Sequence, residues 1–287
     1  MYRTKVSFRL YTSIVALFLI VVAFTSNDDY KQIRIPLGNE SGVPLYKQDI
    51  FYFVNGFDVD EKGYYYFLGG ENAILACFKG NELVYRKKYD ELKANQINIL
   101  DDKLYLFDFK DEKNNLFVLN KADGSIIDSY KNILKNRVNS FLFMDTGLII
   151  EMFDNKKKID MSTQMEFAMF DLTGKFIKQV GNRYDLPKVM YPNEFEVNAT
   201  QFIGKWNNNF VYWDYDIDNK LYRFTLRNKE CKLIGTANID KKFFGKPFYG
   251  NPIEHKKLRN GNIYILSQDG NDAVITVLPL KVLFKAQ

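Results

Sequence analysis

Histidine and cysteine are nearly absent from this sequence, and their scarcity excludes several kinds of chemistry. The chain of 287 residues holds one histidine and two cysteines. A Ser-His-Asp triad or a multi-histidine metal site would have to use His255, and no G-x-S-x-G sequence supplies a matching nucleophile. Cys77 and Cys231 are too few for the disulfide framework of a small secreted domain. We therefore predict no catalytic residue, no metal site and no cofactor, and a structural or exposed His255.

A strong excess of charge of either sign is also missing. Forty Lys and Arg against 35 Asp and Glu give a formal charge of +5 at pH 7, and three of these positive charges lie before residue 10, which leaves +2 (5 − 3). Short basic runs at 86–88, 156–158 and 256–257 stand beside acidic residues, so we predict solvated surface there. A nearly neutral chain without a basic face predicts no nucleic-acid partner.

Long apolar runs are absent except at the N-terminus. Leu10–Phe24 is apolar apart from two hydroxyl residues and follows three basic residues. Fifteen residues are fewer than the roughly 20 of a spanning helix and fit a signal-peptide core. We predict that residues 1–26 are a signal peptide or, alternatively, a retained membrane anchor, and that no lipid anchor follows because no cysteine does. Residues 27–287 would then form one exported domain, touching the membrane only through a retained N-terminal segment.

What the sequence does contain is a repeated strand–turn–strand unit. Aromatic content is 16%, with 25 Phe and 19 Tyr, a bias that favours strands, and no stretch has sustained helical periodicity. The inner turn of each unit recurs 39, 45, 61 and 53 residues after the one before, counted between Gly63, Asp102, Gly147, Asn208 and Gly261. Four strands in each 40–50 residues predict an all-β fold, a β-propeller of four-stranded blades. A β-sandwich or an irregular barrel is the alternative.

The second strand of each unit is apolar on both faces, as a strand packed between two blades requires. We expect burial of 64–68, 104–107, 148–150, 210–213 and 263–266. Five units are visible, with Val282–Lys285 as the last strand, and a sixth blade could be degenerate or assembled from both termini. Ile33–Pro36 is the candidate for the closing strand.

The turn glycines carry a further expectation. Gly63 and Gly174 end short β-turns, so both should have positive φ. Replacing Gly174 by Val should then cost on the order of 1–3 kcal/mol of stability through backbone strain.

The third unit resembles a known family. Phe170-Asp171-Leu172-Thr173-Gly174-Lys175-Phe176-Ile177 and its continuation to Gly181 fit the pattern F-D-x-x-G-K-F/L-I-x-x-I/V-G. The segment 191–195 fits the following G-P-x-E-F/Y loop, except that Tyr191 replaces the glycine and the loop is longer. This unit is similar to those of the six-bladed β-propeller proteins of Bacteroidota, an exported and often lipid-anchored group. The resemblance implies a β-propeller fold and an exported protein that is periplasmic or membrane-anchored facing the periplasm. It implies no particular reaction.

Aromatic residues near the fourth unit are the candidate ligand-binding residues. Trp206, Tyr191 and Trp213 could form a stacking platform for a sugar or a peptide. Trp213 stands in mid-strand, where core packing is favoured, and Trp206 stands beside a turn, which favours ligand contact.

Acidic residues offer two further hypotheses. The segment 214–219 begins as a D-x-D-x-D calcium loop but lacks the required Gly and Glu, so a polar turn is favoured. Carboxylates near inner strands could instead converge on a central channel, as in propeller glycosidases, although turns attract Asp for backbone reasons alone. The candidates are Asp58, Asp60, Asp101, Asp145, Glu151, Glu194 and Glu196.

The sequence therefore predicts a non-catalytic binding or scaffold module of the bacterial cell envelope. Loops at the rim of the propeller would recognise a protein or glycan partner. A glycoside hydrolase using the channel carboxylates is the alternative.

Overall fold

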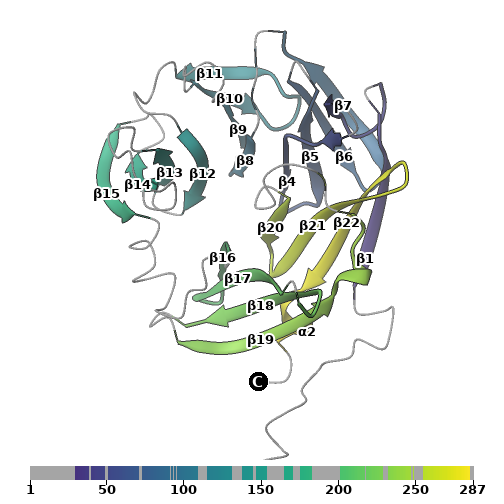
Figure 1. Cartoon of the computed structure of the whole chain (residues 1–287). Coiled ribbons are helices and arrows are strands. Elements are labelled where there is room, and N and C mark those ends of the chain that lie inside the picture. Colours follow the sequence, from purple (N-terminus) through teal and green to yellow (C-terminus); the bar gives the residue numbers. More distant parts are fainter. Residues whose placement is uncertain are drawn as a thin grey trace, which may run out of the picture.

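The computed structural model describes residues 30–284 except 39, 49–50, 71–72, 91, 93, 95, 109–114, 131–137, 145–146, 154–164, 171–174, 183–200, 217, 229–231, 247 and 249–254. In that part of the chain the secondary structure is nearly all β, arranged as five four-stranded antiparallel sheets and one two-stranded sheet (Figure 1). The described residues contain no helix of the length and apolarity that a bilayer crossing requires.

Four of the large sheets are built from strands that are consecutive in the chain, and we number them as blades 1 to 4. Each blade pairs its strands in sequence order, through hairpins. The strands are β4 (Gly56–Val59), β5 (Tyr64–Gly69), β6 (Ile74–Lys79) and β7 (Glu82–Lys88); β8 (Gln96–Leu100), β9 (Lys103–Asp108), β10 (Asn115–Asn120) and β11 (Ile126–Tyr130); β12 (Val138–Met144), β13 (Gly147–Phe153), β14 (Met165–Phe170) and β15 (Phe176–Asn182); and β16 (Gln201–Trp206), β17 (Asn209–Asp216), β18 (Leu221–Arg227) and β19 (Leu233–Asp240).

Blade 5 joins the two ends of the chain. Its strands are β20 (Lys256–Arg259), β21 (Asn262–Asp269), β22 (Asp272–Pro279) and the N-terminal β1 (Lys31–Pro36). Strand β1 runs antiparallel to β22, with Lys31 opposite Val277 and Pro36 opposite Asp272. The prediction that Ile33–Pro36 closes the ring is confirmed, although the strand completes a fifth blade rather than a sixth.

The predicted strand at Val282–Lys285 is wrong. Leu280–Leu283 forms the short helix α2. The reason lies in the sheet: β1 occupies the free edge of β22, so the chain that follows β22 has no edge with which to pair. The remaining elements are the hairpin β2 (Tyr46–Gln48) and β3 (Phe51–Phe53), and the 3₁₀ helix η3 (Lys241–Phe243).

These sheets make a β-propeller. The first strands of the blades, β4, β8, β12, β16 and β20, face the centre in Figure 1, and β7, β11, β15, β19 and β1 form the perimeter. Packing between blades buries the second strands on both faces, as predicted. Phe67, Leu104, Leu106, Tyr212 and Ile263 are each fully buried. The side chains of 148–150 lie outside the described residues.

Cys77 on β6 is a buried free thiol. Burial raises the pKa of its thiol to about 12, so Cys77 acts as a small apolar core residue.

Gly63 has φ +74°, which confirms the predicted positive φ, whereas Gly174 lies outside the described residues. Replacing Gly63 by Ala is expected to lower the free energy of unfolding by about 1 kcal/mol, because a Cβ is strained at this φ. Thermal unfolding followed by circular dichroism measures the loss. Lys62→Ala in the same exposed turn is the matched control and should change stability by less than about 0.5 kcal/mol. Equal melting temperatures for the two variants would contradict the strained turn.

Candidate functional site: the central channel

The inner strands of blades 5, 1 and 2 meet at one ion pair, whose carboxylate is fully buried and whose guanidinium is partly exposed. Asp58 on β4 is fully buried, and its Oδ2 accepts hydrogen bonds from the Ile99 backbone N–H (2.8 Å) and from Arg259 Nη2 (3.2 Å). Arg259 on β20 also donates to the carbonyl oxygens of Val59 and Ile99, each at 3.2 Å. One carboxylate and one guanidinium therefore join three blades.

The second buried carboxylate, that of Asp60 just after β4, serves a turn. Asp60 is buried, and its Oδ1 accepts from the backbone N–H groups of Lys62 (2.9 Å) and Tyr64 (2.8 Å). Its Oδ2 lies 3.5 Å from Lys121 Nζ of blade 2. Both carboxylates thus bind protein groups, whereas glycosidic cleavage requires an acid and a partner carboxylate that reach the sugar.

Of the other predicted channel carboxylates, only the side chain of Asp101 lies within the described residues. Asp101 sits in the exposed β8–β9 turn with φ +55°, a position that suits Asp for backbone reasons. Asp145, Glu194 and Glu196 lie outside the described residues. Glu151 is on β13, but its side chain also lies outside them.

Two neighbouring lysines on β20 point to opposite sides. Lys257 Nζ reaches Asn98 Oδ1 of blade 2 at 3.5 Å, across the inner strand of blade 1. Lys256 turns toward blade 4, where its Nζ lies 3.5 Å from the centre of the Trp213 ring and 5.8 Å from that of Tyr222. The prediction that 256–257 is solvated surface is wrong for Lys256, which is 8% exposed. Burial lowers the pKa of Lys256 to about 7, and the aromatic faces oppose that shift by favouring the charged form.

His255 is structural, one of the two roles predicted for it. The ring is buried, and its Nε2 lies 3.0 Å from the carbonyl oxygen of Val54. The neutral imidazole donates this hydrogen bond through Nε2–H. Burial lowers the pKa of His255 to about 4 because the charged form loses its hydration.

The single histidine gives a sharp pH prediction. Since its pKa falls from about 6.5 in the unfolded chain to about 4 in the fold, the unfolded chain takes up the proton first as the pH drops. This stabilisation is complete above pH 6.5 and is lost toward pH 4, on the order of 3 kcal/mol in all. The one imidazole signal in a carbon–proton NMR spectrum should not move between pH 7 and pH 5. His255→Gln should make the free energy of unfolding less dependent on pH between pH 6.5 and pH 4. A titration midpoint near pH 6.5 for His255 in the folded protein would contradict its burial.

The structure separates the two predicted tryptophans. In the β16–β17 hairpin Trp213 pairs with Gln201 and Trp206 pairs with Asn209, so they lie at opposite ends. Trp213 is 5% exposed, in agreement with the core packing favoured for it. Trp206 is half-buried beside Gly261 and stacks on Phe284, with 6.4 Å between ring centres. Tyr191 lies outside the described residues, so ligand contact at these three positions stays a prediction.

The calcium-like segment is a polar turn. Asp214 and Asp216 end β17 and bind Arg223 at 3.4 and 2.9 Å. Asp216 also accepts from the backbone and side-chain N–H groups of Asn219, both at 3.0 Å. Among the described residues no group of three or more His, Cys, Asp or Glu could hold a metal ion.

Comparison with known proteins finds similarity in structure only. The sequence matches no protein-family model and no curated protein. Solved structures are similar over most of the chain at low identity. BamB from Moraxella catarrhalis has 12% identity, a TM-score of 0.44, and alignment over 86% of this chain and 99% of its own. A DUF4221 family member from Bacteroides vulgatus has 14% identity, a TM-score of 0.45 and coverage of 86% and 95%. Glutaminyl cyclase from Myxococcus xanthus has 12% identity, a TM-score of 0.48 and coverage of 85% and 96%.

Neither partner nor reaction follows from likenesses this distant, and the propeller rests on the sheet topology itself. Sequence reasoning missed Arg259 and Lys256 as residues of the channel. Arg259 is separated from Asp58 by 201 residues, and only the closed ring brings them together. The available signal was that Lys256 shares one side of this short inner strand with the apolar Leu258, and one side of such a strand must be buried.

Proposed function

We propose that this chain is a non-catalytic binding or scaffold propeller of the bacterial cell envelope. The observation that carries the proposal is the Asp58–Arg259 pair, because Asp58, one of the predicted channel carboxylates, is engaged in holding blades 5, 1 and 2 together. Asp60 is likewise engaged by a turn and by Lys121. A ring whose described inner carboxylates are engaged in structural contacts leaves its rim and connecting loops for recognition.

The compartment is part of the same proposal. A basic N-terminus followed by the apolar Leu10–Phe24 supports export, and so does the resemblance of the third unit to exported propellers of Bacteroidota. The connection between β15 and β16, residues 183–200, supports a recognition role by its length and by Tyr191. The partner is a protein or a glycan, with Tyr191 and Trp206 as the proposed contacts, since Trp213 is packed in the core.

Site-specific photo-crosslinking in the envelope of the producing cell tests this proposal. A benzoyl-phenylalanine at position 191 should give discrete adducts, whereas the same group at Asn81, in the exposed β6–β7 turn, is the control. The full chain should not hydrolyse aryl glycosides. Hydrolysis that disappears in Asp58→Asn would overturn the proposal, and so would identical adducts at 191 and 81.

A further inference from the structure

A repeated apolar feature lies on the perimeter of the propeller. All seven large apolar side chains that are exposed among the described residues fall near the start of an outer strand. They are Leu83 and Val84 on β7, Ile126 and Ile127 on β11, Ile177 on β15, and Leu233 and Ile234 on β19, each 40–55% exposed. Consecutive residues of a strand face opposite sides. Exposure of both members of a pair therefore means that neither side of the strand is covered there.

These apolar sites share one end of the ring. The β6–β7 turn lies beside the β4–β5 turn, because Lys79 pairs with Tyr64. Between blades, Lys121 of the β10–β11 turn reaches Asp60 of the β4–β5 turn, and Asn260 of the β20–β21 turn donates to the Glu61 carbonyl at 3.0 Å. The turns before the outer strands and the turns between the first two strands thus form one surface, which we name the hairpin end.

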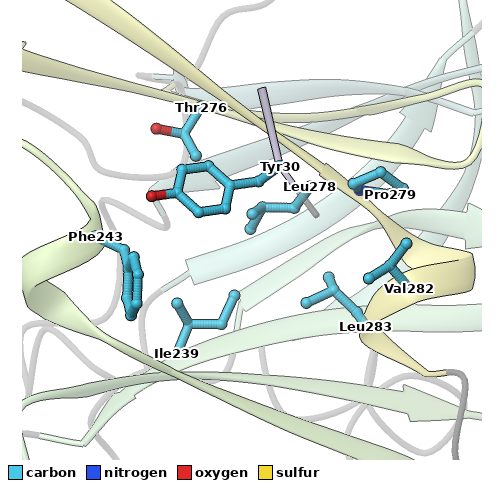
Figure 2. A pocket seen from close by; sticks show the side chains of 8 residues that line it. All are labelled: Tyr30, Ile239, Phe243, Thr276, Leu278, Pro279, Val282 and Leu283. Atoms are coloured by element: carbon cyan, nitrogen blue, oxygen red, sulfur yellow. The ribbon is translucent and has the colours of Figure 1, made fainter. Parts of the chain in front are cut away.

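The chain enters the fold at this same end. The Leu280 N–H donates to the carbonyl of Gly261 in the β20–β21 turn at 2.8 Å, which places the end of β22 there. Strand β1 is antiparallel to β22, so it starts beside that end. Tyr30, just before β1, is fixed in an apolar pocket between blades 4 and 5 with Phe243, Leu278 and Leu283 (Figure 2). Its ring meets that of Phe243 edge to face, with 5.8 Å between ring centres.

The sequence before Tyr30 limits how far the hairpin end can lie from a membrane. Six residue steps separate Phe24, the last residue of the apolar run, from Tyr30. A fully extended chain covers at most about 20 Å in six steps. When Leu10–Phe24 is inserted in a bilayer, Tyr30 must therefore lie within about that distance of the membrane surface. The hairpin end is then the part of the propeller nearest to the lipid.

We propose that the hairpin end of this propeller rests on the bilayer interface, with the aliphatic sites of blades 1 to 4 inserted between lipid headgroups. The sites are spread around the perimeter, so one flat surface can contact them together, whereas a protein interface is usually a single contiguous patch. Exposed lysines stand at or near the sites, at Lys79, Lys175 and Lys232, and favour contact with anionic headgroups.

Depth-dependent quenching in reconstituted full-length chain tests this orientation. Cys231 is replaced by Ser, so that an environment-sensitive fluorophore labels Val84→Cys alone, because Cys77 is buried. The matched control is Asn271→Cys, in the β21–β22 turn at the opposite end. In vesicles of phosphatidylcholine and phosphatidylglycerol with brominated acyl chains, we expect quenching at position 84 to exceed that at 271 by about threefold or more. Equal quenching at both positions overturns the proposal and favours a protein as the occupant of the hairpin end.

Two further variants separate binding by the apolar sites from simple tethering. A Gly/Ser insertion of about 40 residues after Phe24 lets the propeller leave the surface, and quenching at 84 should persist if the sites bind lipid. In the same long-linker chain, Ser at 126, 127, 233 and 234 should reduce quenching at 84 to the level at 271, with the melting temperature nearly unchanged because these side chains are exposed. Loss of quenching with the long linker, or its retention in the Ser variant, overturns the proposal.

Discussion

Deletion of residues 31–36 is expected to abolish the cooperative unfolding transition of the propeller. The deletion removes β1, whose six residues pair with β22 and close the ring. It also exposes one face of an apolar cluster that contains Ile33, Ile35, Ala273 and Ile275. Two buried isoleucines contribute about 3–6 kcal/mol, a large share of the 5–15 kcal/mol of a typical domain. The newly exposed edge of β22 would in addition promote aggregation.

A pair of point variants isolates the buried side of β1. Ile35→Ala should lower the free energy of unfolding by about 2–5 kcal/mol, because the side chain is fully buried. Arg34→Ala on the exposed side of the same strand is the control and should cost less than about 1 kcal/mol, since its ion pair with Asp269 is solvated. Urea unfolding followed by tryptophan fluorescence measures both. Equal effects of the two variants would contradict closure through the apolar side of β1.

The second large effect is expected at the channel ion pair. Asp58→Ala should destabilise the fold by about 3–5 kcal/mol, because it leaves the Ile99 N–H and part of the Arg259 guanidinium without their acceptor. Asp269→Ala breaks the exposed pair with Arg34 and should cost about 0–1 kcal/mol.

A double-mutant cycle with Arg259→Ala measures the coupling directly. Asp58 and Arg259 bind each other, and both bind the Ile99 backbone, Asp58 through the N–H and Arg259 through the carbonyl oxygen, so the double variant should be more stable than the sum of the two single losses predicts. Additive losses would mean that Asp58 and Arg259 act independently, and would remove the main support for blades 5, 1 and 2 being held together by this pair.

The contacts of the candidate site could not be predicted from the sequence, because they join residues of different blades. The turns and strands of each blade are local, so Gly63, the Asn260-Gly261 turn and the apolar second strands were predictable from neighbours a few residues away. The partners of Asp58, Lys256 and His255 come from other blades, and no local pattern encodes which residues meet there.

The sequence by itself determined the repeating unit, the burial of its second strands and the strand that closes the ring, because each depends on alternation of apolar residues and on turn residues. Only the tertiary structure decided that β1 completes blade 5, since pairing with β22 left Leu280–Leu283 without a sheet edge and turned it into a helix. The tertiary structure also decided the roles of the inner carboxylates. Ring closure brings Arg259 to Asp58 across 201 residues, and a charge that is paired and buried in this way holds blades together.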